Sequence, residues 1–375
     1  MSDNIPFEMQ VEIMKKLPVK SLIQFRSVSK SWKHLIDSSN FITDYTRQHT
    51  HTQHLLIAGI GYELKYMLVA DDDTFPQHKL HLTFPLLENM LKYPCLLGCS
   101  YGLLCLVTKG VNGSMCRAVV LNPCIRKSVI VDVSHVEDTR YSAVVGFGVC
   151  RETRDPKLVK VTYIEREVDV ERIDCIPRQV EVFTLSGGAS RSSYGNLPRK
   201  SICFRPYQVV TDGILYFLAL DRNSIHEFHM IVSFDLTSEA FREISLPCSL
   251  AYGFPNGLSM SKLRESLVVI QIAKEDNSQI SVVWMMEDGV PESFTKLFTI
   301  NTDTPNVKVM GFRKNGELIV QFFENDCKLV VYEAYSRHID NLRIDGTGFS
   351  YGVYPYRETL LLHDQPNLKM FCLGN

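Results

Sequence analysis

The sequence has few features of a secreted, membrane-bound or nucleic-acid-binding protein. Its formal net charge is only -2 over 375 residues, whereas general nucleic-acid binders are usually strongly basic. No stretch approaches the roughly 18 consecutive apolar residues of a membrane helix. The N-terminal MSDNIPFEMQ lacks the basic and apolar regions of a signal peptide. We therefore expect a cytoplasmic or nuclear protein that binds neither nucleic acid nor membrane.

Patterns typical of disulfides, metal sites and cofactor sites are also missing. The 11 cysteines are odd in number and form no C-x-x-C pair, so reduced thiols packed as small hydrophobes are expected. His49, His51 and His54 have metal-like spacing, but no Cys, Asp or Glu lies nearby to complete a tetrahedral site. No phosphate-binding loop is present, and we predict no metal and no cofactor.

The N-terminal segment does show a clear helical pattern. Apolar residues recur at helical spacing at Ile5, Met9, Ile13 and Leu17. Pro18 ends that helix and can lie in the first turn of the next. Ser29 is a candidate N-cap of a third helix, and Ser38 or Ser39 of a fourth. We take residues 1–48 as a helical domain and residues 49–375 as a second domain.

Three or four short helices rarely bury enough apolar surface to be stable alone. The helices could dock on the rest of the chain, or their apolar faces could belong to a partner. The spacing does not choose between the two. Trp32 is equally open, because it suits either an internal core position or an interface.

After about residue 50 the sequence changes to short apolar strands separated by Gly, Asn, Asp and Pro, with no convincing helix. One strand type recurs and ends at Asn122, Thr184, Asp235, Met285 and Glu333, at intervals of 62, 51, 50 and 48 residues. Repeats of roughly 40–50 residues containing about four strands are typical of β-propeller blades. We interpret the charged residues 165–174 in the long first interval as an elongated hairpin or surface loop.

Remaining strands near residues 55–70 and 349–362 predict about six irregular blades, with the N- and C-terminal strands pairing to close the ring. The predicted fold is therefore α+β and multi-domain, with a small helical domain before a mainly antiparallel β domain. A β-sandwich or an incomplete propeller is the structural alternative.

Two short motifs resemble nucleophile sites but lack the necessary context. Residues 348–352 match G-x-S-x-G, which requires a following helix that Pro355 opposes. Residues 259–262 match S-x-x-K without its companion motifs, and we interpret them as a loop. A propeller glycosidase or sialidase would need converging carboxylates, tyrosine and arginines at the ring's centre, where mainly apolar or small residues are expected. We predict a protein without catalytic residues.

The N-terminal segment resembles an F-box, the module that binds the Skp-type adaptor of SCF ubiquitin ligases. The match includes Ile5-Pro6, Glu12-Ile13, LPVKSL over 17–22, Phe25-Arg26, VSKSW over 28–32 and Leu35-Ile36, with Ile5, Met14 and Gln24 as mild departures. The resemblance implies that adaptor contacts are made by Ile5, Pro6, Ile13, Leu17, Pro18, Leu22 and Val28.

Residues 95–362 resemble the plant F-box-associated domain, which is propeller-like. Matching fragments include SYGLLCL from Ser100, LNPCIRKS from Leu121 and IVSFDLTSEAFREISLP from Ile231. Leu121 and Phe294 stand where tryptophan is usual in this family.

Together the resemblances imply a non-catalytic substrate-recognition subunit of an SCF-type ubiquitin ligase. The F-box would bind the adaptor, and through it a cullin and a RING subunit, while the β domain binds a target protein. The alternative is a propeller that binds a small ligand or glycan without a ligase role. An aromatic-rich loop over residues 351–356 would suit that role, and buried packing within a blade explains these residues equally well. The residues select no target, no binding face and no pathway, whether immunity, self-incompatibility or another.

Overall fold

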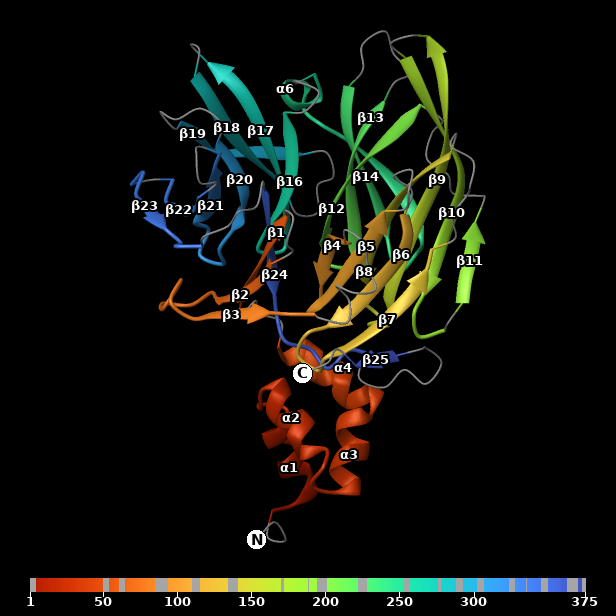
Figure 1. Cartoon of the computed structure of the whole chain (residues 1–375), viewed down its shortest axis with the longest axis vertical. Coiled ribbons are helices and arrows are strands. Elements are labelled where there is room, and N and C mark those ends of the chain that lie inside the picture. Colours follow the sequence, from red (N-terminus) through yellow and green to blue (C-terminus); the bar gives the residue numbers. More distant parts are fainter. Residues whose placement is uncertain are drawn as a thin grey trace.

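The structure is a computed structural model of the chain in which four helices form a module at one end of a β-propeller (Figure 1). It describes residues 5–49, 54–60, 65–84, 94–109, 115–133, 141–169, 172–187, 189–193, 201–221, 228–252, 257–275, 278–287, 293–301, 307–323, 328–334, 336–344, 350–362 and 370–372. Within these ranges no helix combines the length and the apolar character that crossing a membrane requires.

The four N-terminal helices begin where the sequence pattern indicates. They are α1 (Phe7–Met14), α2 (Val19–Phe25), α3 (Lys30–Asp37) and α4 (Ser39–Gln48). The hydroxyl of Ser29 accepts the backbone N–H of Trp32 at 3.2 Å, and that of Ser38 accepts the N–H of Phe41 at 3.3 Å. Both serines are therefore N-caps, because each satisfies a backbone donor that the first helical turn leaves free. Pro18 occupies the N-cap position of α2.

Six antiparallel sheets follow, and each forms one blade. The strands of blade 1 are β1 (His54–Ile60), β2 (Lys65–Ala70), β3 (Lys79–Leu82) and β24 (Ser350–Tyr356). Those of blade 2 are β4 (Pro94–Ser100), β5 (Leu103–Lys109), β6 (Met115–Asn122), β7 (Lys127–Asp132) and β25 (Met370–Cys372). Those of blade 3 are β8 (Tyr141–Val149), β9 (Pro156–Asp169), β10 (Arg172–Thr184) and β11 (Ala189–Ser193).

Blades 4 to 6 have the same four-stranded order. Blade 4 contains β12 (Ile202–Thr211), β13 (Ile214–Asp221), β14 (Phe228–Asp235) and β15 (Ala240–Ser245). Blade 5 contains β16 (Leu258–Leu263), β17 (Ser266–Glu275), β18 (Ser278–Met286) and β19 (Phe294–Asn301). Blade 6 contains β20 (Val307–Phe312), β21 (Leu318–Phe322), β22 (Leu329–Tyr332) and β23 (Ile339–Asn341).

The repeat found in the sequence corresponds to these blades. The recurring strand ends fall at or within one residue of the ends of the third strands β6, β10, β14, β18 and β22. The long first interval holds the paired strands β9 and β10 of 14 and 13 residues, so residues 165–169 and 172–174 belong to an elongated hairpin, the first of the two predicted alternatives. The six-bladed propeller is confirmed.

The ring closes by pairing the first and last strands of blade 1, also as predicted. β24 is the innermost strand of this blade, and its register with β1 runs from His54↔Tyr356 to Ile60↔Ser350. A buried ion pair joins blade 1 to blade 6, because the fully buried Asp71 accepts Arg313 Nε at 2.9 Å and the Lys314 N–H at 2.8 Å. Closure of this kind removes the free strand edges that an open sheet would expose.

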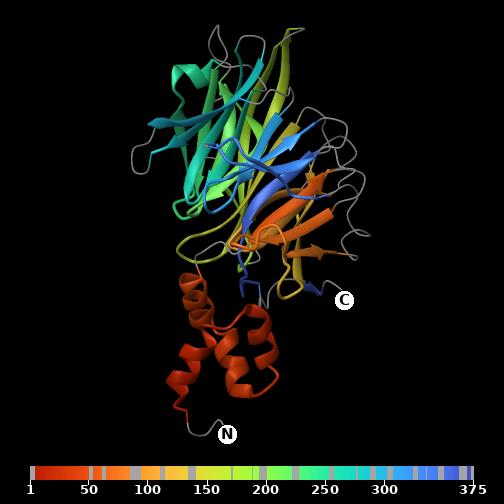
Figure 2. The same cartoon turned by 90° about the vertical axis from the view of Figure 1, so that its left-hand side faces the viewer.

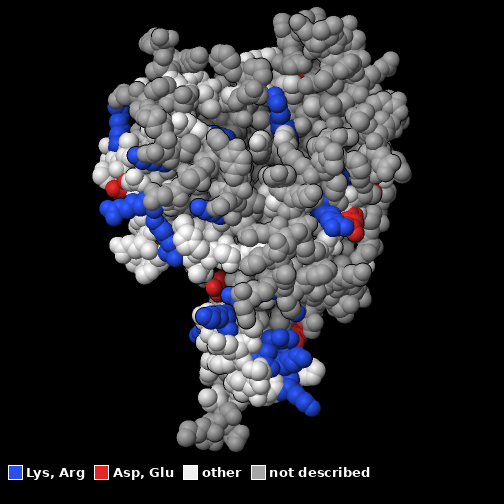
Figure 3. Space-filling view, in the orientation of Figure 1, with Lys and Arg blue, Asp and Glu red and all other residues white. Residues whose placement is uncertain are grey.

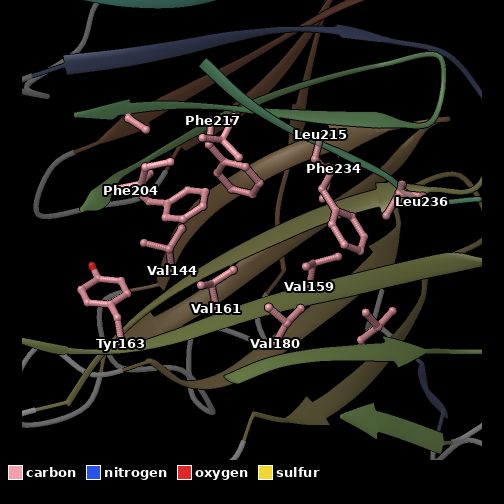
Figure 4. Packing of buried hydrophobic residues seen from close by; sticks show 14 of the residues in the cluster. Val144, Val159, Val161, Tyr163, Val180, Phe204, Leu215, Phe217, Phe234 and Leu236 are labelled. Atoms are coloured by element: carbon pink, nitrogen blue, oxygen red, sulfur yellow. The ribbon is translucent and has the colours of Figure 1, made fainter. Parts of the chain in front are cut away.

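Apolar side chains fill the space between neighbouring blades. Figure 4 shows this packing between blades 3 and 4, where Val144 and Val161 face Phe204 and Phe217. Side chains of blade 4 pack directly against the backbone of β8: a Cβ added to Gly146 would lie 2.6 Å from the Phe217 ring. Such packing is dense enough that single added atoms disturb it.

Three sequence-based interpretations need correction. A short helix, α6 (Cys248–Ala251), occurs beyond residue 50, and it lies at the end of the propeller far from the helical module (Figure 1). Residues 259–262 are part of β16 rather than a loop. The aromatic residues 351–356 belong to β24, with Tyr351 and Tyr356 buried, so they form a strand rather than a ligand-binding loop.

Candidate functional site

The helical module exposes an unusual amount of apolar side chain. Half of the exposed large hydrophobic residues in the described chain lie on it: Ile5, Phe7, Met9, Ile13 and Val28, with exposed fractions of 44%, 47%, 57%, 48% and 63%. Single exposed apolar residues are ordinary, whereas a group of them indicates an interaction surface. We call these five residues the outer apolar surface.

The apolar residues that recur at helical spacing in α1 are exposed rather than packed into a core. Met9 and Ile13 are four residues apart and lie along one side of this helix, and Ile5 precedes its N-cap Pro6. Met14 follows Ile13, roughly 100° further around the helix, and is only 2% exposed. The pattern therefore has two faces, one exposed and one packed.

The structure places the seven sequence-predicted contact residues differently. Ile5, Pro6, Ile13, Pro18 and Val28 are exposed, and Leu17 is partly buried. Leu22 is fully buried and packs with Met14, Val19 and Ile36. The helix α2 turns the Leu22 side chain into the module. The role of all seven residues in adaptor binding stays a prediction.

The contact residues implied by the family resemblance omit two members of the outer apolar surface, Phe7 and Met9. The helical spacing of Ile5 and Ile13 already included Met9, which was not assigned a contact. Phe7 has no such signal, because it is the first residue of α1 and only the structure shows that it is half exposed.

Side-chain hydrogen bonds hold the four helices together beneath this surface. Arg26 binds Asp37 through two parallel bonds, from Nε to Oδ1 at 2.6 Å and from Nη2 to Oδ2 at 2.7 Å, a geometry that orients both groups. Trp32 donates its indole N–H to Gln10 Oε1 at 2.9 Å, and its ring lies 5.3 Å from that of Phe25. Of an internal packing position and an interface position, Trp32 therefore occupies the internal one, because its contacts lie within the helical module.

Basic side chains outnumber acidic ones on the helical module, and we call them the basic rim. Residues 5–49 contain seven Lys and Arg but four Asp and Glu. On the face shown in Figure 3, basic side chains gather on the helical module beside uncharged surface. An apolar centre with a charged rim is the usual anatomy of a protein interface.

The propeller carries candidates for a second surface. Its most exposed aromatic side chains are Tyr207, 77% exposed at the irregularity of β12, and Tyr252, 62% exposed directly after α6. In the described part of the chain, no group of three or more His, Cys, Asp or Glu is placed to hold a metal ion. Of the histidines with metal-like spacing, His51 lies outside the described residues.

The serine motifs do not form nucleophile elbows. Ser350 begins strand β24 and Ser259 lies within strand β16, so neither stands at a strand-to-helix turn. Gly348 of the G-x-S-x-G match lies outside the described residues. The apolar surface of the helices is therefore the best-defined candidate site.

A short helical module that exposes apolar surface, joined to a rigid propeller, defines a two-part interaction protein. Comparison with known proteins gives the family. Residues 2–44 match the F-box domain, and residues 62–347 match the F-box associated beta propeller domain. The chain belongs to the plant family of F-box proteins with this associated propeller.

Relatives in Arabidopsis thaliana share this arrangement over most of their length. The chain is 24% identical to F-box protein At4g19940, covering 91% of this chain and 86% of that protein. It is 25% identical to F-box protein CPR1, covering 96% and 89%. Among solved structures, oligopeptidase B from Trypanosoma brucei is 8% identical with a TM-score of 0.37 over 80% of this chain and 42% of that one, a likeness too distant to bear on function.

Proposed function

We propose that this protein is a substrate-recognition subunit of an SCF-type ubiquitin ligase. The helical module would bind a Skp-type adaptor through its outer apolar surface, and through the adaptor a cullin and a RING subunit. The propeller would bind the target protein. The observation that carries the proposal is the exposed apolar side chains of Met9 and Ile13 on an F-box helix, with the exposed Ile5 just before it.

The surface also indicates the chemistry of the adaptor. Its partner needs an apolar patch for the exposed side chains of α1 and acidic residues opposite the basic rim. A stable protein interface of this kind buries roughly 1,200–2,000 Å² in total, and residues at its centre dominate the binding energy.

Catalysis in such an assembly would come from proximity rather than from groups of this chain. A bound target is held near a ubiquitin-charged enzyme, which raises the effective concentration of its lysines. This role requires two binding surfaces in a fixed relation and no acid, base or nucleophile. We expect the protein to work in the cytoplasm, the nucleus or both.

Copurification tests the proposal. The wild-type chain and an Ile5→Asp, Val28→Asp double variant are expressed in plant cells with the proteasome inhibited. Leu80→Asp is the matched control, because Leu80 is 61% exposed on β3 of the propeller, outside the helical module. Adaptor and cullin should accompany the wild type and the control but not the double variant, while a target should accompany all three. Wild-type protein that recovers no adaptor would contradict the proposal.

A further inference from the structure

The helical module rests on the propeller through the chain that follows the last strand of blade 1. Residues 357–362 leave β24 and cross between the module and the propeller (Figures 1 and 2). We call these six residues the C-terminal latch. They lie beyond residues 62–347, the span that matches the family's propeller domain.

One latch residue completes the core of the helical module. Leu360 has no exposed surface and packs with Met14, Leu22, Ile36 and Phe41, which come from all the parts of the module. It is thus a core residue of the F-box helices although more than 300 positions separate it from them in the sequence. Deleting a fully buried leucine side chain removes favourable packing and leaves a cavity.

The latch also satisfies backbone groups at the helix ends. Glu358 Oε2 accepts the Val19 N–H at 3.2 Å, at the first residue of α2, where Pro18 supplies no side-chain cap. Arg357 Nη1 donates to the carbonyl of His49, just after α4, at 3.4 Å. A carboxylate at a helix N-terminus and a cation at a helix C-terminus both suit the helix dipole.

Other contacts fix the latch to blade 2. The buried Asn122 donates from Nδ2 to the carbonyls of Thr359 and Leu361, each at 2.8 Å. The turn at Gly102, with φ of +79°, lies so close that an added Cβ would overlap the carbonyl oxygen of Arg357. The latch therefore has one side bound to the propeller and the other inside the helical module.

Blade closure places the latch beside the chain connection to the module. α4 precedes β1, and the latch leaves β24, whose Tyr356 pairs with His54 of β1. The chain connects the module to β1, and the latch adds non-covalent contacts next to that connection. The chain connection alone would leave the orientation of the module free, whereas the latch contacts and the shared core residue Leu360 restrict it.

We propose that the C-terminal latch is a positioning element of the adaptor-binding site: it orders the F-box helices and fixes their orientation on the propeller. This inference rests on the proposed function, since it assigns to Leu360 and Glu358 a role in adaptor binding without adaptor contact. Adaptor and target would be held at a constant separation. The F-box would bind its adaptor fully only when the ring is closed.

Variants of the full-length chain test this dependence. Leu360→Asp should weaken binding of a purified Skp-type adaptor at least tenfold and accelerate amide hydrogen exchange in α2, while exchange in β13 stays as in the wild type. Leu360→Met, which keeps the size and apolar character, should bind within about threefold of the wild type. Leu80→Asp is again the control. Wild-type affinity and wild-type exchange in Leu360→Asp would overturn the proposal.

If Leu360→Asp unfolds the whole chain, a second variant and a second measurement still test the role of the latch. Glu358→Ala, which removes the acceptor of the Val19 N–H, should accelerate exchange at the Val19 amide severalfold and leave the propeller unchanged; unaltered exchange there counts against the latch. Spin labels encoded at positions 28 and 80, which are 63% and 61% exposed, report orientation. Their distance distribution should broaden in the latch variants, and one as narrow as in the wild type overturns the proposal.

These readouts separate the two proposals. If the wild-type chain binds no adaptor, the proposed ligase role fails, and hydrogen exchange and spin-label distances still decide the latch. If the wild type binds and the latch variants bind equally, the ligase role stands and the latch fails.

Discussion

Replacing Ile13 by Asp gives the sharpest test of the outer apolar surface. Ile13 is 48% exposed, so the substitution should lower the free energy of unfolding by about 1 kcal/mol, the contribution of the half of this side chain that is already buried. Binding is different, because an interface would bury the remaining half of this side chain. Full burial of an isoleucine contributes roughly 1.5–3 kcal/mol, which makes the lost half about 1 kcal/mol.

The introduced carboxylate adds a larger penalty, since it would be desolvated without a partner at a cost of at least about 2 kcal/mol. The sum of about 3 kcal/mol corresponds to an adaptor affinity roughly 100-fold weaker, at 1.4 kcal/mol for each factor of ten. Biolayer interferometry with immobilised adaptor measures the affinity, and thermal unfolding measures stability.

Substitution of a buried residue of the helical module supplies the comparison with Ile13→Asp. Leu22→Ala should lower the stability of the helical module by about 2–5 kcal/mol, because Leu22 is fully buried. It should weaken adaptor binding only by unfolding the helices. An Ile13→Asp chain that stays folded and binds the adaptor as well as the wild type would refute the assignment of the exposed face of α1.

Four further outcomes are expected. Asp71→Ala should destabilise the closed ring by about 1–3 kcal/mol in denaturant unfolding, since it leaves Arg313 Nε and the Lys314 N–H without their acceptor while Arg313 keeps its ion pair with Glu317; an unchanged midpoint would contradict this account of closure. Gly146→Ala should cost about 1–3 kcal/mol, because its new Cβ meets an aromatic ring at 2.6 Å, whereas Gly59→Ala, whose nearest neighbour is at 3.7 Å, should show no such clash. Adaptor affinity should fall as the salt concentration rises from about 50 to about 500 mM, because salt screens the attraction between the basic rim and an acidic partner; an affinity that does not change with salt would show that the rim lies outside the interface. Burial lowers the pKa of His54, so its contribution to stability is complete above about pH 6.5 and decreases as the pH falls toward the lowered value; His54→Gln should flatten that part of the stability curve.

Much of this fold could be predicted from local sequence. Helix starts at Ser29 and Ser38 follow from side chains that cap the first turn, and the caps form as expected. The blade repeat follows from strands of alternating or continuous apolar character that end at regular intervals. Closure by the terminal strands could also be predicted, because an unpaired strand at each end of the repeat leaves two edges to be joined.

The candidate site could be predicted only in part. The periodicity of α1 identifies an apolar face, yet it does not say whether that face is buried or exposed. Leu22 and Ile13 both fit the motif, but one has no exposed surface and the other is half exposed. Exposure depends on what packs against a helix, and this information is absent from the helix's own sequence.

The sequence by itself determined the helices, their caps, the strand repeat and the membership of the chain in its family. These properties depend on hydrogen bonding and apolar spacing between residues close together in the chain. Only the tertiary structure decided which faces of the helices remain free. Leu360 enters the helical core from the far end of the chain, and it can do so because ring closure brings β24 beside β1. From the sequence, the apolar helix faces could pack either on the rest of the chain or on a partner protein. The fold covers one face with the latch and leaves the other exposed.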